Sequence, residues 1–206
     1  MDSLLNIFVV LFVVVDPLGL APMFTALAHG LDVTAQRRIA IKGTALSAVI
    51  LLLFFLSGDL LLQALGISLS AFQIAGGLLL LLLAIDMVFA RQSGLRSTTS
   101  REQEEAEHRQ DISVFPLAFP LIAGPGALTT VLLMAAQPTD AALFAGMLGA
   151  ILAVLALTLV SLLTAARLMA FLGETGTNVI SRVLGLVLAA LAVQFILDGV
   201  QSGLMS

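Results

Sequence analysis

Long apolar runs, separated by short polar stretches, dominate this chain of 206 residues. A membrane-spanning helix needs about 20 consecutive, predominantly apolar residues. Runs of that length are rich in Leu, Ala, Val and Ile with glycine inside, a composition common in membrane helices. They cover residues 4–28, 40–62, 69–90, 113–136, 141–166 and 179–203. The pattern predicts an all-α integral membrane protein with six transmembrane helices.

One long polar stretch, residues 91–112, divides the chain into two halves. Residues 1–90 and 113–206 each hold three predicted helices, and the polar stretch between them reads as a loop. Because three is odd, two halves with the same internal order must cross the membrane in opposite directions. We therefore expect two inverted three-helix repeats joined by the loop.

Two matching proline pairs support the repeat. Pro17-Leu18-Gly19-Leu20-Ala21-Pro22 interrupts the first span, and Pro120-Leu121-Ile122-Ala123-Gly124-Pro125 interrupts the fourth, 103 residues further along. Proline removes a backbone donor and clashes with the preceding helical turn. In lipid such a break persists only where protein or a cavity satisfies the freed backbone groups. Paired breaks in corresponding positions point to a transporter's binding site, so we expect discontinuous helices 1 and 4 that meet near the membrane midplane.

The basic residues predict the orientation. All nine fall at or in the loops between helices 1 and 2, 3 and 4, and 5 and 6, and basic loops remain cytoplasmic. Both termini are therefore expected outside, which in a bacterium is the periplasm. The N-terminus lacks the positive region of a cleaved signal peptide. The nine are Arg37, Arg38, Lys42, Arg91, Arg96, Arg101, Arg109, Arg167 and Arg182.

Composition excludes several function classes. The chain is 60% hydrophobic and 11% charged, against about 25% charged residues in soluble domains. Without cysteine it has no disulfide, thiol nucleophile or thiolate metal site. No basic stripe suggests nucleic acid, and no nucleotide-binding motif suggests direct use of ATP. An intramembrane aspartyl protease needs two carboxylates at one depth, whereas Asp16 and Asp86 differ by about 8 Å in expected depth. We expect no enzyme, no metal and no cofactor.

Asp16 is the first candidate site residue. It lies about 12 residues into the first span, roughly 18 Å deep at 1.5 Å per residue. Ionisable residues at such depth are functional candidates by default, here for coupling to H⁺ or Na⁺. Asp before a proline is also a common helix start, with Asp as N-cap and Pro17 at the first helical position. The two roles are compatible, and both stay open at this point.

The second break supplies a candidate binding loop, Ala123-Gly124-Pro125-Gly126-Ala127. Glycine lets a ligand approach the backbone closely. If a helix begins at Pro125, the N–H groups of Gly126, Ala127 and Leu128 point into the break. A helix N-terminus of this kind attracts anions such as a substrate carboxylate. The hydroxyls of Thr129 and Thr130 follow in the first turn. The alternative is a kink that serves packing alone.

Other intramembrane polar residues have structural interpretations. Asp86 is expected to extend toward the interface. Gln73 and Gln194 either join a polar pathway or link helices by hydrogen bonds, and linking is the favoured role. Gly199-x-x-x-Gly203 permits close helix packing and is compatible with a homo-oligomer, without identifying one.

At these motifs the chain resembles the MarC family of bacterial and archaeal inner-membrane proteins. The resemblance rests on two segments and covers the whole chain. They are Val15-Asp16-Pro17-Leu18-Gly19 with Pro22, and Phe115-Pro116-Leu117-Ala118-Phe119-Pro120-Leu121-Ile122-Ala123-Gly124-Pro125-Gly126-Ala127. A branch of that family transports small neutral amino acids such as glycine and alanine. The resemblance thus implies substrate contacts at Asp16, Pro17, Gly19 and the backbone of residues 123–127.

The leading hypothesis is a secondary transporter of small neutral amino acids or similar solutes, coupled to H⁺ or Na⁺. Its expected partners are a small-molecule substrate and the lipid bilayer. A zwitterion would place its carboxylate at the half-helix after Pro125 and its ammonium toward Asp16 or freed carbonyls. The competing hypothesis is a passive channel or an accessory membrane subunit.

Overall fold

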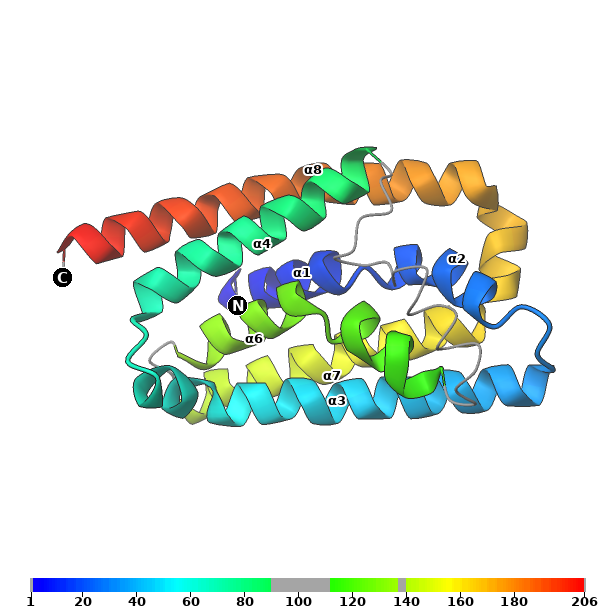
Figure 1. Ribbon diagram of the computed structural model, residues 1–206, viewed down its shortest axis with the longest axis horizontal. Helices are drawn as coiled ribbons and strands as arrows, with labels where there is room; N and C mark the ends of the chain where they lie inside the picture. The colour runs from blue at the N-terminus through cyan, green and yellow to red at the C-terminus, as the bar shows by residue number, and fades with distance from the viewer. Residues whose placement is uncertain (1, 90–111, 137–139, 206) are drawn as a thin grey trace.

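The computed structural model describes residues 2–89, 112–136 and 140–205, and these residues contain helices and no strand. Most of the polar loop 91–112 lies outside the described residues. The helices follow one another as an elongated bundle (Figure 1). They are α1 (Asp2–Val15), α2 (Pro17–Leu27), α3 (Val33–Ala64), α4 (Leu69–Phe89), η1 (Ser113–Ile122), α6 (Pro125–Ala135), α7 (Ala141–Leu163) and α8 (Ala165–Met205).

The chain runs back and forth along the long axis of this bundle. The start of α1, the end of α8 and the α3–α4 connection lie toward one end, and the α2–α3 and α7–α8 connections lie at the other (Figure 1). Five described segments are long and apolar enough to cross a membrane, and η1 with α6 forms a further span bent by 59°. The predicted all-α membrane protein is confirmed, with five spans or six when the bent pair is counted.

The start of α3 differs from the expected loop boundary. The second span was expected from residue 40, but α3 begins at Val33, where the Asp32 carboxylate accepts a hydrogen bond from the Ala35 N–H at 2.9 Å. Arg37 and Arg38 therefore lie in the first turns of α3 and not in a loop. The cause is an N-cap, which satisfies free N–H groups well before the apolar run begins.

The helix pair α4–α8 packs closely through glycine. A Cβ on Gly77 would lie 2.8 Å from the Ala192 carbonyl oxygen, and one on Gly199 would lie 2.9 Å from that of Ser70. Both distances are too short for a side chain, so these glycines permit the close approach. Gly199, the first residue of the predicted packing motif, thus serves a contact within the chain.

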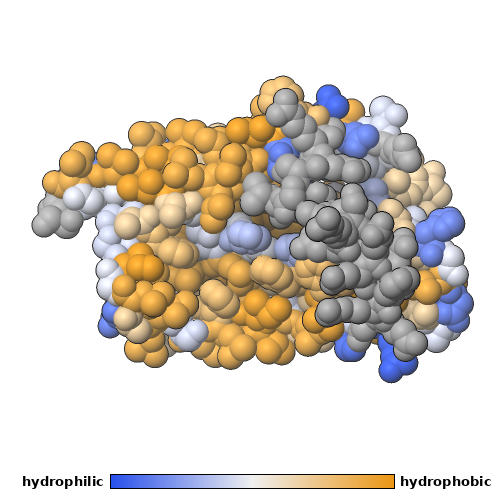
Figure 2. All heavy atoms as spheres, viewed as in Figure 1, coloured by the Kyte–Doolittle hydropathy of each residue, from blue (hydrophilic) through white to orange (hydrophobic). Residues whose placement is uncertain are grey.

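The outer surface is suited to lipid. Figure 2 shows hydrophobic residues over most of the visible side, with hydrophilic residues concentrated toward the end that holds the α2–α3 connection. Large apolar side chains such as Leu56 and Leu186 are exposed along the helices. Contiguous apolar surface on this scale marks contact with a membrane rather than with water.

Candidate functional site

The first break is a single residue, Asp16, between α1 and α2. Its backbone is left-handed, with φ 51° and ψ 65°, and it is the one non-glycine residue of the described chain with a positive φ. Asp and Asn adopt this conformation more readily than other residues with a side chain. The side chain is 1% exposed, and its Oδ1 accepts a hydrogen bond from the Gly19 N–H at 3.0 Å. Asp16 therefore caps α2, while its role in ion coupling stays a prediction.

Gly19 makes room for that carboxylate. A Cβ at position 19 would overlap Oδ2 of Asp16 and lie 2.7 Å from its Cγ. Pro17 occupies the first turn of α2, as expected for a proline at a helix start. Its carbonyl oxygen accepts a hydrogen bond from the Ser161 hydroxyl of α7 at 2.6 Å. The family resemblance implied substrate contacts at Pro17 and Gly19, which stay a prediction; the structure shows contacts of both residues within the protein.

The second break has wide, irregular turns before it. Phe115 and Phe119 are extended, and each precedes a cis proline. The Ala123 N–H donates to the Ala118 carbonyl at 2.9 Å. Gly124 is then extended and leads directly into α6. A Cβ on Gly124 would overlap the Pro120 carbonyl oxygen, so glycine is required here by the close passage of the backbone.

The start of α6 differs from the prediction in one respect. The Leu128 N–H donates to the Gly124 carbonyl at 3.0 Å and so belongs to the helix itself. The N–H groups of Gly126 and Ala127 come before this first helical bond. Of the two threonines, Thr130 donates its hydroxyl to the Gly126 carbonyl at 2.9 Å. Thr129 places its methyl group where a Cβ of Gly76 would otherwise lie.

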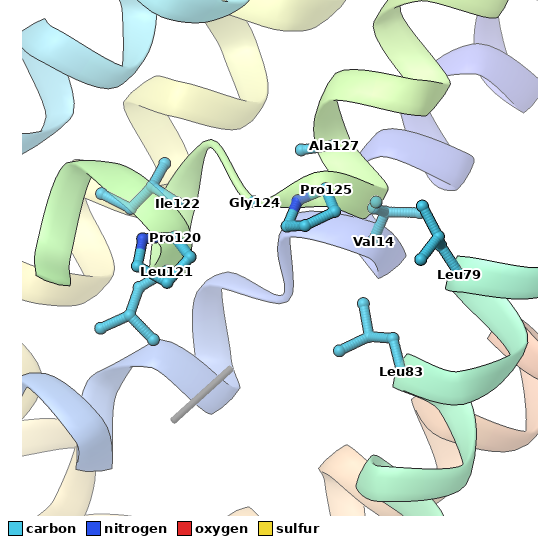
Figure 3. A pocket seen from close by; sticks show the side chains of 10 residues that line it. Val14, Leu79, Leu83, Pro120, Leu121, Ile122, Gly124, Pro125 and Ala127 are labelled. Carbon is cyan, nitrogen blue, oxygen red and sulfur yellow. The ribbon is translucent and has the colours of Figure 1, made fainter. Parts of the chain in front are cut away.

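A cavity of about 20 Å³ lies beside the second break. Figure 3 shows it between α1, α4, η1 and α6, with Pro120 and Pro125 on either side of Gly124. Three predicted site residues line it: Gly124, Gly126 and Ala127. The other predicted residues, namely Asp16, Pro17, Gly19, Ala123 and Thr129, do not. The lining residues are Val14, Leu79, Leu83, Pro120, Leu121, Ile122, Gly124, Pro125, Gly126 and Ala127.

The sequence did not reveal the contribution of α4. Leu79 and Leu83 form one wall of the cavity, but they belong to the unbroken run of leucines from Leu78 to Leu83. No polar residue or break marks them. Val14 comes from the other broken span and lies two residues before Asp16, so residues next to both breaks reach the same part of the bundle.

Hydroxyl groups tie each break to a helix of the other half. Ser161 of α7 binds the Pro17 carbonyl in the first break, and Ser47 of α3 donates to the Ala118 carbonyl in η1 at 3.2 Å. Both serine side chains are buried. The Ala118 carbonyl also accepts the Ala123 N–H, so the Ser47 hydroxyl adds a second hydrogen bond to that oxygen. Within the described ranges, no three His, Cys, Asp or Glu side chains are grouped as a metal site.

Comparison with known proteins settles the family. The sequence profile of the family described as "MarC family integral membrane protein" matches residues 1–204. The chain belongs to the MarC family. No solved structure matches it.

Relatives of this MarC protein come from distant organisms. The UPF0056 membrane protein YvbG of Bacillus subtilis is 35% identical over 198 residues, covering 96% of this chain and 94% of YvbG. A UPF0056 membrane protein of Methanocaldococcus jannaschii is 36% identical over 195 residues, covering 95% of this chain and 94% of its own. YhcE of Escherichia coli, another UPF0056 membrane protein, is 34% identical over 195 residues, or 94% and 90% of the two chains. Relatives that are named as membrane proteins thus occur in both bacteria and archaea.

Proposed function

We propose that this MarC protein is a secondary transporter of small neutral amino acids, of the glycine and alanine class, or of similar small solutes. The observation that carries the proposal is the arrangement of the two breaks inside one membrane bundle. A buried carboxylate lies at one break, and a glycine-rich helix start with a cavity lies at the other. Intramembrane carboxylates and broken helices are both typical of transport sites.

An inverted repeat is part of the proposal, and the packing supports it. Suppose that α1, α2, α3 and α4 of the first half correspond in that order to η1, α6, α7 and α8 of the second. Each principal contact between two helices then has an equivalent contact between the two corresponding helices. The helix α3 packs against η1 and α6, while α7 packs against α1 and α2; likewise α4 packs against α6, and α8 against α2. The contacts α4–α8 and α3–α7 map onto themselves. A pseudo-two-fold axis in the membrane plane would produce this pattern.

The substrate would bind at the second break in an enlarged cavity. About 20 Å³ holds one water-sized group, so an amino acid requires the surrounding helices to move apart. Its carboxylate would then accept hydrogen bonds from the Gly126 and Ala127 N–H groups at the start of α6. Its ammonium would face Asp16 or carbonyls near the first break; Val14, two residues before Asp16, lines the cavity, whereas Asp16 does not.

Coupling would use the charge of Asp16. A carboxylate buried at this depth is costly unless a proton or cation neutralises it, and transport of an H⁺ or Na⁺ ion with the substrate supplies that neutralisation. We propose that the protein lies in the bacterial inner membrane with both termini in the periplasm. Arg37, Arg38 and Lys42 at the start of α3 support this orientation, because they share one end of the bundle with the α7–α8 connection.

The test is counterflow in proteoliposomes. Vesicles loaded with unlabelled alanine should accumulate external labelled alanine transiently, because a carrier exchanges one substrate molecule for another. A passive channel would let the label equilibrate without an overshoot, and an accessory subunit would transport nothing. Repeating the assay with imposed H⁺ or Na⁺ gradients identifies the coupling ion. The absence of an overshoot with every small neutral amino acid would reject the proposal.

A further inference from the structure

The apolar wall of the cavity faces the start of α6 directly. Leu79 and Leu83 are four residues apart and therefore lie on one face of α4. In Figure 3 both side chains extend toward the segment that holds Gly124 and Pro125, with Val14 beside them. Leu83 is 7% exposed, so the surrounding helices enclose it almost completely.

The space above Gly126 is already nearly filled. A Cβ on Gly126 would lie 2.9 Å from Cδ2 of Leu80, 3.2 Å from Cγ1 of Val14 and 3.4 Å from Cδ2 of Leu83. These atoms are the ends of side chains and not backbone. The remaining cavity of about 20 Å³ holds one water-sized group, and a methyl group is of similar size.

We propose that Leu83, together with Val14, sets the upper limit on the size of the substrate's side chain. This inference rests on the proposed function and names the part of the site that selects the substrate. A substrate whose carboxylate lies at the start of α6 directs its side chain toward Leu83. When the bundle opens to admit the amino and carboxylate groups while α4 keeps its packing against α6, the space beside Leu83 admits hydrogen or methyl, as in glycine and alanine, and excludes the branched side chain of valine. The wall is apolar throughout, so selection here is by size.

The experiment measures counterflow of labelled glycine, alanine and valine by the full-length protein and by the variants Leu83→Ala, Gly126→Ala and Leu82→Ala, with Leu83→Val in reserve. Leu83→Ala removes part of the wall and should raise the valine-to-alanine rate ratio about tenfold or more, as expected when a hydrophobic pocket gains room for extra carbon atoms. Gly126→Ala adds a methyl group to the cavity and should lower the alanine-to-glycine ratio about tenfold. The ratios do not depend on how much protein is folded, because both substrates are measured in the same vesicles.

Leu82→Ala is the matched control. It makes the same chemical change one residue away, on a side chain that is 49% exposed. Both ratios should stay within about twofold of the wild-type values. If Leu83→Ala is inactive toward all substrates, Leu83→Val and Gly126→Ala decide the question, since each changes the cavity less.

Unchanged ratios in Leu83→Ala and Gly126→Ala, or wild-type transport of valine as fast as alanine, would overturn the size limit while leaving the transporter proposal intact. If the wild-type protein exchanges no amino acid at all, the proposed function itself fails. The two failures are therefore distinguishable within one set of vesicles.

Discussion

Replacement of Asp16 by Asn separates the two roles of this residue. Asparagine keeps a side-chain oxygen that accepts the hydrogen bond from the Gly19 N–H, and it tolerates a positive φ as well as aspartate does. It removes the charge and the site for a proton. We expect the free energy of unfolding to change by less than about 0.5 kcal/mol, whereas ion-driven accumulation of substrate is lost.

Alanine at the same position gives the contrasting result. Asp16→Ala loses the cap, which costs about 1 kcal/mol. It also places a residue without polar side-chain atoms at φ 51°, which costs a further 1–2 kcal/mol or so. We expect a total destabilisation of about 2–3 kcal/mol. Asp16→Gly should lie between Asn and Ala, because glycine accepts the backbone conformation without strain.

The assay combines unfolding with transport. Stability is measured by thermal unfolding in detergent micelles, and uptake is measured in proteoliposomes with and without H⁺ and Na⁺ gradients. Normal gradient-driven accumulation by Asp16→Asn would refute the coupling role and leave Asp16 as a cap alone. Equal stability of the Asn and Ala variants would refute the capping energetics.

Three further predictions concern the glycines and the orientation. Gly19→Ala should displace the Asp16 carboxylate and strongly reduce coupled transport. The stability of the variant should change little, because the loss of the cap is offset by about 1 kcal/mol of helix propensity. Uptake and melting temperature are measured on the same preparation. Gly124→Ala should destabilise the protein by about 1–3 kcal/mol through overlap with the Pro120 carbonyl, as seen in its melting temperature. For both, Gly149→Ala is the control, because nothing lies within 4 Å of the added carbon, and an equal effect there would contradict the explanation. The chain has no cysteine, so single cysteines can be introduced at Ser3, Ser100 and Ser206. On intact cells an impermeant thiol reagent should label positions 3 and 206 but not position 100. Labelling at position 100 and not at the two ends would show that the orientation is the opposite of the one proposed.

Much of the fold was predictable because its determinants are local. The length and apolarity of each run predict a membrane helix without knowledge of its neighbours. A proline interrupts a helix through its own ring and its missing N–H, so the positions of both breaks were readable from Pro17 and Pro125. The cap at Asp16 also followed from two adjacent residues.

The composition of the site was only partly predictable. Gly124, Gly126 and Ala127, which were predicted to bind substrate, line the cavity, whereas the carboxylate of Asp16 turns back to the Gly19 N–H. Which direction it takes depends on φ at Asp16 and on the absence of a Cβ at Gly19. Neither the serine contacts nor the use of the Leu128 N–H in the helix ladder was anticipated, because each depends on the geometry reached after the break.

The sequence by itself determined the class of protein, an all-α membrane protein whose five or six spans follow its apolar runs. Only the tertiary structure decided that Leu83 forms a cavity wall while Leu82 is exposed, and that Gly199 packs against α4. The leucines of α4 are chemically identical, and in a membrane the lipid-facing side chains are as apolar as the buried ones. Hydrophobicity therefore does not distinguish the two faces, and the contacts between helices far apart in the chain do.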